Sequence, residues 1–159
     1  MFFNHWRENI ANQSKLRFYA KVKHEFGEEA YLSLNNRAHR VQISKLRSSS
    51  HDLLIEKGRY GVTTSNNISG KACRFCCVND NVMHLEQLPF FEQPIIESEE
   101  HVLNTCPFYD SIRAGLSDNL KCLLMLKEYG LIMSSAHSKE FGRYLFDCFK
   151  VRNPEPEKD

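Results

Sequence analysis

The sequence predicts a small, mostly α-helical domain. Apolar residues recur at helical spacing in several segments, whereas strand-like alternation of apolar and polar residues is rare. A chain of 159 residues with 42% hydrophobic content can bury one core of ordinary size. We expect one structural domain that runs as a basic helical segment over 1–62, a module with a long internal loop over 63–113, closing helices over 114–152 and a disordered tail over 153–159.

Two helices are expected in the first segment. In SKLRFYAKVKHEF, residues 14–26, apolar side chains fall three or four positions apart, and Gly27 is expected to end the helix. A second helix is expected over 28–46, because two acids in its first turn favour the helix dipole. The residues expected to face inward from this helix are Tyr31, Leu34, Ala38 and Val41.

Three more helices are expected in the last third of the chain. Pro107 favours a helix start, so residues 108–116 should form a short helix. Residues 120–129 should form another, closed by Gly130. Cys122 is assigned to the apolar face of this helix, in the core. The last helix has a clean apolar stripe that consists of Phe141, Tyr144, Leu145, Cys148 and Phe149.

Charge is distributed unevenly along a chain whose net charge is only +1. Residues 1–70 carry eleven Lys and Arg against six Asp and Glu, whereas residues 71–113 carry three against seven. We therefore expect an anionic partner to meet the first part of the chain, with single-stranded or structured RNA as the ligand. The basic residues expected to contact it are Arg37, Arg40, Lys45 and Arg47. A solvated helix face explains the same segment equally well.

Cysteine and histidine residues form two short motifs separated by 24 residues. CRFC contains Cys73 and Cys76, and a CxxC spacing lets two thiolates converge on one ion from a tight turn. ESEEHVLNTCPFY, residues 97–109, adds His101 and Cys106. Three sulfurs and one imidazole suit tetrahedral zinc in a closed structural site, which leaves no position for water or substrate. We therefore expect a CCHC zinc module, inserted in the helical domain, and no catalytic activity.

The residues alone leave other assignments open. CxxC also occurs by chance or as a redox motif, although no βαβ pattern surrounds this one. A histidine near a cysteine on a helix can simply be a packed core residue. Cys77 is a competing thiol and His84 a competing imidazole. Leu88, Phe90 and Phe91 in the same spacer are expected to belong to the core, with an exposed contact loop as the alternative.

Four segments, in their order along the chain, resemble the C-terminal region of LINE-type (non-long-terminal-repeat) retrotransposon reverse transcriptases. These are SKLRFYAKVKHEFGEEAYL, NNRAHRVQISKLRSSSHDLLIEKGRYG, the CxxC motif and ESEEHVLNTCPFYDSIR, of which EEHVLNTCPFYDSIR is the most specific part. In that family a basic helical segment leads into a Cys/His zinc-binding module near the end of the polyprotein. The resemblance implies that Cys73, Cys76, His101 and Cys106 bind zinc and that the closing helices form a scaffold around them.

The chain departs from that family in two respects. Its spacer contains VMHLEQLPFFEQPII, which is longer than the family leads us to expect, and no polymerase palm, paired-aspartate motif or endonuclease domain is recognisable. We therefore expect a remnant that cannot copy RNA but binds RNA or another nucleic acid weakly. A zinc-stabilised protein–protein interaction module is the alternative, which the near-neutral net charge keeps open.

The sequence also gives an expectation about location. The N-terminal apolar run is too short for a signal peptide, and no apolar run approaches the roughly 20 residues that span a bilayer. We expect an intracellular protein, nuclear or cytoplasmic, with no membrane partner. In that setting its six cysteines should be thiols or metal ligands rather than disulfides.

Overall fold

The computed structural model describes residues 2–13, 16–23, 27–57, 71–76 and 95–154. This part of the chain is mostly helical, as the sequence predicts, and its β-pairing is limited to one isolated antiparallel bridge between Ala72 and Ile96. The chain divides into two compact units, one formed by residues 1–50 together with 111–159 and the other by residues 51–110. None of the described helices is long and apolar enough to cross a membrane.

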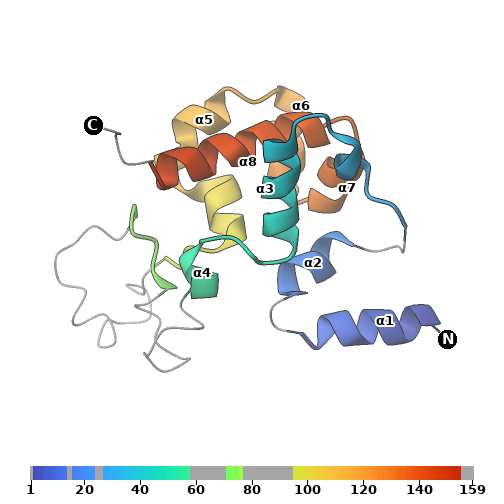
Figure 1. Ribbon diagram of the computed structural model, residues 1–159. Coiled ribbons are helices and arrows are strands. Elements are labelled where there is room, and N and C mark those ends of the chain that lie inside the picture. The colour runs from blue at the N-terminus through green and yellow to red at the C-terminus, as the bar shows by residue number, and fades with distance from the viewer. Residues whose placement is uncertain (1, 14–15, 24–26, 58–70, 77–94, 155–159) are drawn as a thin grey trace, which may run out of the picture. The chain divides into compact units, whose positions relative to one another are not determined.

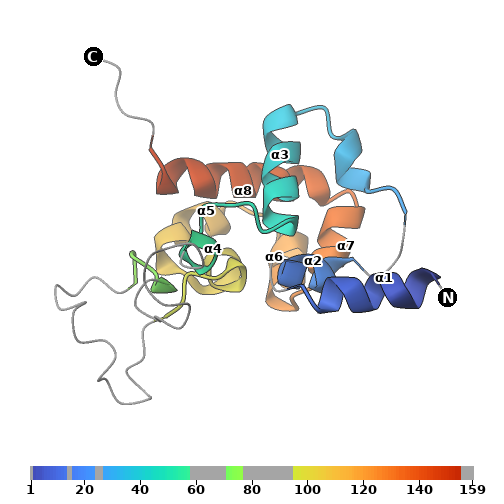
Figure 2. The same ribbon diagram turned by 60° about the horizontal axis from the view of Figure 1, so that its bottom comes forward.

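The first unit contains most of the helices (Figures 1 and 2). In chain order they are α1 (Phe2–Ala11), α2 (Arg17–Val22), the 3₁₀ turn η2 (Ala30–Ser33), α3 (Arg37–Arg47), α5 (Asp110–Ala114), α6 (Asp118–Met125), α7 (Tyr129–Ser134) and α8 (Ser138–Arg152). Asp110, the first residue of α5, belongs to the second unit. The two longest of these, α3 and α8, lie across each other in both views.

A close approach between α3 and α8 forms the centre of this unit. Ile43 on α3 and Phe141 and Leu145 on α8 are completely buried. Gly142 permits the contact, because a Cβ atom at this position would lie 2.8 Å from the Cβ of His39. All five residues of the predicted apolar stripe of α8 are buried, so that prediction is confirmed, including the burial of Cys148; Ser138, Gly142 and Arg152 are buried as well.

The expected helix over 28–46 is wrong, because the chain forms two elements there. Residues 30–33 make the 3₁₀ turn η2, and the backbone then becomes extended. Asn36 starts α3 by accepting a hydrogen bond from the backbone N–H of His39 (3.2 Å), the usual role of an N-cap asparagine. The new register also leaves Val41, expected to face inward, 37% exposed.

The expected helix over 120–129 is also wrong in its C-terminal boundary. Ser117 caps α6 through a bond from the N–H of Leu120, and α6 ends at Met125. Lys127 then takes a left-handed conformation (φ 59°), and the N–H of Glu128 bonds back to the carbonyl of Leu123, as in a Schellman turn. Gly130, expected to close this helix, lies inside α7.

Cys122 departs from its predicted place in the core. It lies on α6 but is exposed, whereas the buried residues of this helix are Leu120 and Leu124. The spacing of apolar residues around Cys122 fits two helix faces, and the structure buries the other one.

The second unit contains less regular structure. Its elements are α4 (Leu54–Lys57), the single bridge between Ala72 and Ile96, a π-helical turn η6 (His101–Thr105) and a 3₁₀ turn η7 (Pro107–Tyr109). Pro107 opens η7 at its first position and α5 follows, which confirms the helical character predicted for residues 108–116. Most of the expected disordered tail, from residue 155 on, lies outside the described residues.

Candidate metal centre

Cys73 and Cys76 are held on one side of a tight turn. The preceding residues are fixed by the Ala72–Ile96 bridge, in which Cys73 donates its N–H to the carbonyl of Ile95 (2.7 Å). The turn closes where the N–H of Cys76 bonds to the carbonyl of Cys73 (3.2 Å). The two thiols of the CxxC motif therefore converge, as the sequence predicts.

His101 and Cys106 are brought together by the π-helical turn η6. Residues five positions apart in an α-helix point about 140° apart around its axis, so an α-helix would separate these two side chains. The chain instead forms a wider turn, closed by a bond from the N–H of Cys106 to the carbonyl of His101 (2.8 Å). Turns of this type are rare and occur often at functional sites.

The four side chains predicted from the sequence meet in one cluster. Their ligand atoms all lie within 4.8 Å of one another. The Sγ atom of Cys106 is 3.9 Å from that of Cys73 and 3.6 Å from that of Cys76, and the Sγ atom of Cys76 is 3.3 Å from Nε2 of His101. Cys73, His101 and Cys106 are buried and Cys76 is partly exposed. A cluster of this composition and size can hold a metal ion.

A second hydrogen bond orients the imidazole of His101. Its Nδ1 atom lies 3.0 Å from the Oγ1 atom of Thr105, whose hydroxyl in turn donates to the carbonyl of His101 (3.4 Å). When a metal occupies Nε2, Nδ1 carries the ring proton and donates it to Thr105, because the Thr105 hydroxyl hydrogen is used for that carbonyl. The lone pair of the neutral ring is then on Nε2, which faces the thiols, the arrangement that metal-binding histidines generally have.

The three thiols differ in pKa. Burial raises the pKa of Cys73, but hydrogen bonds from His101 and from the backbone N–H groups of Phe75 and Cys76 outweigh it and lower the pKa to about 7. Burial and the neighbouring sulfurs of Cys106 and Cys73 raise the pKa of Cys76 to about 12. Burial also raises the pKa of Cys106. Three thiolates so close together repel one another, and a bound cation would offset that repulsion.

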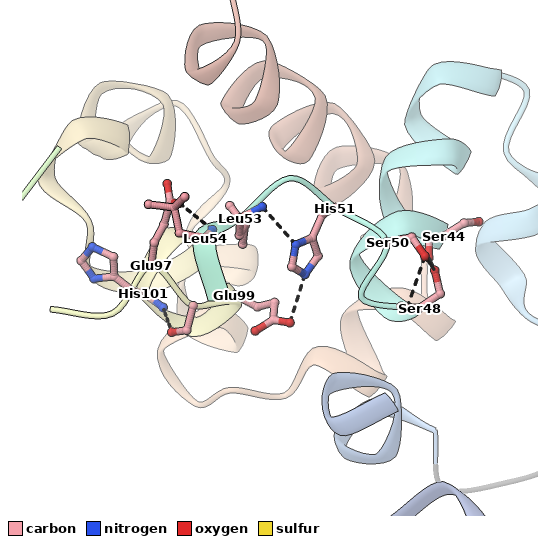
Figure 3. Close-up of polar contacts among 10 residues, drawn as sticks. Ser44, Ser48, Ser50, His51, Leu53, Leu54, Glu97, Glu99 and His101 are labelled. Carbon is pink, nitrogen blue, oxygen red and sulfur yellow. Dashed lines mark hydrogen bonds and ion pairs between the residues drawn. The ribbon is translucent and has the colours of Figure 1, made fainter. Parts of the chain in front are cut away.

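The acids that precede His101 attach the segment that carries the candidate ligand His101 to residues 51–57 (Figure 3). Glu97 is completely buried; its side chain accepts a hydrogen bond from the N–H of Leu54 (2.8 Å), and its carbonyl accepts one from the N–H of Ile55 (3.3 Å). The carboxylate of Glu99 accepts from Nε2 of His51 (3.0 Å), with both side chains buried. These acids can be noticed in the sequence just before His101, but nothing in the sequence indicates that His51, Leu54 and Ile55 are their partners.

His51, Glu56 and Glu99 form a second group of possible ligands within 4.8 Å of one another. The Nδ1 atom of His51 accepts from the N–H of Leu53 (3.4 Å), so the ring proton is on Nε2, where it is donated to Glu99. A metal at Nε2 would have to displace that proton to Nδ1, against the Leu53 N–H. We therefore interpret this group as a buried hydrogen-bonded pair beside Glu56.

The basic residues predicted to contact RNA differ in their exposure. Arg37 and Lys45 are exposed, and Arg40 is half-buried and donates to the carbonyl of Leu34. Arg47 is only 4% exposed, pairs with Glu29 (2.9 Å) and lies over the rings of Tyr19 and Tyr31. Its guanidinium therefore has a role inside the first unit, and the exposed face of α3 is formed without it.

Several other candidates from the sequence lie outside the described residues. These are Cys77, His84, Leu88, Phe90 and Phe91. The five described cysteines are all free thiols. No protein-family model, curated protein or solved structure matches this chain.

Proposed function

We propose that this chain is a non-catalytic zinc-binding module that binds RNA or another single-stranded nucleic acid weakly. The observation that carries the proposal is the cluster of four ligand atoms from Cys73, Cys76, His101 and Cys106 within 4.8 Å. The resemblance to the C-terminal region of LINE-type reverse transcriptases supports an origin in a retroelement polyprotein.

Zinc is the metal that fits this cluster best. Bond lengths of about 2.3 Å to sulfur and about 2.0–2.1 Å to nitrogen give a tetrahedron with edges of about 3.8 Å between sulfurs and about 3.6 Å between sulfur and nitrogen. The corresponding separations here are 3.9 and 3.6 Å between sulfurs and 3.3 Å between Cys76 and His101. Three thiolates and one imidazole are also a common structural zinc set, whereas harder cations prefer oxygen ligands.

A metal bound in this way is structural. Four protein ligands complete a tetrahedron and leave no position at which the ion could activate water. The ion would instead join residues 73–76 to residues 101–106, two segments that are far apart along the chain. Structural zinc contributes on the order of 10 kcal/mol or more of folding free energy in small modules.

Elemental analysis of the purified protein tests the metal assignment. We expect about one equivalent of zinc per chain, lost in the Cys106→Ala and His101→Ala variants. Cys122→Ala is the matched control, because this thiol is exposed on α6 and should leave the zinc content unchanged. Full retention of zinc in a Cys73→Ala, His101→Ala double variant would refute the assignment.

The nucleic-acid part of the proposal rests on charge. Residues 1–70 have an excess of five positive charges, and α3 exposes Arg37 and Lys45 with Arg40 half-buried beside them. Two or three phosphate contacts give weak binding, in the micromolar range or weaker, that tolerates changes of sequence and falls as salt rises. We propose single-stranded RNA as the ligand of this face.

A titration with single-stranded RNA at two salt concentrations tests this part. We expect the Arg37→Glu, Arg40→Glu variant to bind more weakly and with a smaller salt dependence than the parent. The control is Lys139→Glu, Lys150→Glu, which makes the same change of net charge at two exposed positions of α8. Equal affinity of the parent and the α3 variant would favour the alternative, a zinc-stabilised protein-interaction module, which the net charge of +1 supports.

A further inference from the structure

Aromatic rings from both halves of the metal cluster form a stack in the second unit. The rings of Phe75 and Phe108 are nearly parallel, at 7°, with centroids 3.7 Å apart. The guanidinium of Arg74 lies 5.0 Å from the centroid of Phe75. Tyr109 meets both phenylalanines edge to face and is itself completely buried. The buried tyrosine therefore supports a pair of rings that extends outward.

The outer part of this stack is accessible to solvent. With one ring face against Phe75, Phe108 still has 41% of its surface exposed, and Arg74 is exposed as well. Single exposed apolar residues are ordinary on protein surfaces. Two parallel rings beside an exposed guanidinium are a more specific indication of a base-stacking site. The distance between the two rings is close to the rise of about 3.4 Å between successive bases of one nucleic-acid strand.

The metal ligands fix the position of both rings. Phe75 lies between Cys73 and Cys76, and Phe108 follows Cys106 by two positions. The backbone N–H of Phe75 bonds to the sulfur of Cys73, and that of Phe108 bonds to the sulfur of Cys106. Zinc would thus hold the rings ready for a ligand, which lowers the entropy lost on binding.

We propose that the exposed ring of Phe108, backed by Phe75 and Arg74, is a stacking site for an unpaired base of single-stranded RNA. This inference rests on the proposed function and assigns to it a second set of contact residues, in addition to the basic residues of α3. Stacking on aromatic rings does not depend on which base is present, and Arg side chains add cation–π contacts or bind the phosphates. The site is accordingly one for unpaired RNA of any sequence.

The charges around the stack predict how the site depends on salt. The described cations of the 71–76 segment are Lys71 and Arg74, while three thiolates and one zinc ion together carry about one negative charge. Phosphate attraction is therefore small here, and stacking provides most of the affinity. Loss of the Phe108 ring should weaken binding at every salt concentration and leave the salt dependence nearly unchanged, unlike charge reversal on α3.

The test uses the full-length, zinc-loaded protein and a short fluorescein-labelled polyuridylate. Phe108→Ala should lower the affinity about 5- to 150-fold, the range for loss of one stacked base. Its zinc content should stay at the parent's value, because alanine keeps the backbone N–H that bonds to Cys106. Phe108→Trp should restore the affinity. Ile95→Ala is the matched control, since Ile95 is an exposed apolar residue of the same unit (51%) and should bind like the parent.

The outcomes separate this inference from the proposal on which it rests. If the parent binds the polyuridylate and Phe108→Ala binds it equally well with its zinc in place, the stacking site is refuted while the proposed function stands. If the parent binds no RNA at all, both are refuted. An equal loss of affinity in Phe108→Ala and Ile95→Ala would indicate a general apolar contact, typical of a protein partner, and would also overturn the stacking site.

Discussion

The two units differ in what holds them together, and this difference predicts how the chain responds to loss of metal. Among the described residues, the second unit buries only four large apolar side chains, Leu53, Val102, Leu103 and Tyr109. It also buries several ionisable groups, including Glu97 and the His51–Glu99 pair. The first unit has a far larger apolar core, centred on α3 and α8. A core of the size seen in the described part of this unit usually needs a metal or disulfides to fold.

We therefore expect removal of zinc by a chelator to unfold the second unit and leave the first unit folded. About 10 kcal/mol of metal-binding free energy exceeds what four apolar side chains can replace, at about 1.5–3 kcal/mol each, once the ordering of the backbone is counted. Hydrogen exchange followed by mass spectrometry measures this directly. Peptides that cover residues 71–76 and 95–106 should lose their protection, whereas those from α3 and α8 should keep theirs.

The amides that lose protection after removal of zinc decide whether the reasoning holds. The amides of Cys73, Glu97 and Cys106 bond to backbone carbonyls within the second unit, so they report its folding without dependence on the ligand side chains. Protection of these amides that survives complete removal of zinc would refute the metal's structural role. Simultaneous loss of protection in α3 and α8 would refute the independence of the first unit.

Three further predictions concern single side chains. Thr105→Val removes the acceptor for Nδ1 of His101 and should weaken zinc binding about 10-fold, at the low end of the usual range because Thr105 is exposed. Thr105→Ser keeps the acceptor and should not weaken zinc binding. Competition with a chromophoric chelator measures both affinities. Gly142→Ala, whose Cβ would lie 2.8 Å from that of His39, should destabilise the first unit by about 1–3 kcal/mol in urea unfolding. Burial raises the pKa of Glu29, but its two basic partners outweigh this and lower the pKa. The stabilising effect of Glu29 is therefore complete above the unfolded pKa of about 4.3 and is lost as pH falls through the folded pKa. Glu29→Gln should remove that part of the acid sensitivity.

The four residues of the candidate metal centre could be predicted from the sequence because their spacing is local. CxxC closes one turn and HxxxxC another, so each pair is determined within six residues, and only the meeting of the two pairs requires the fold. His51 could not be predicted in the same way. Its partner Glu99 is 48 positions away, and nothing near His51 in the sequence distinguishes it from an exposed polar residue.

The helices show the same division between local and non-local information. The apolar stripe of α8 is regular enough to predict its buried face correctly. In the segment over 28–46, acids in a first turn and regular apolar spacing favoured one long helix, but the capping side chain of Asn36 starts a new helix there. Arg47 shows the limit for charged residues, because only the fold brings it against Glu29 and Tyr31 and takes it from the basic surface into the interior.

The spacing between His101 and Cys106 connects the local sequence to the metal most directly. A five-residue interval suits neither face of an α-helix, and the chain satisfies it by widening one turn so that the N–H of Cys106 reaches the carbonyl of His101. Such turns are seldom stable by themselves, so this one needs a compensating interaction. A metal bound to both side chains would provide it. Pro107 follows at once, ends the wide turn and starts η7, which sets Phe108 and Tyr109 beside the CxxC turn.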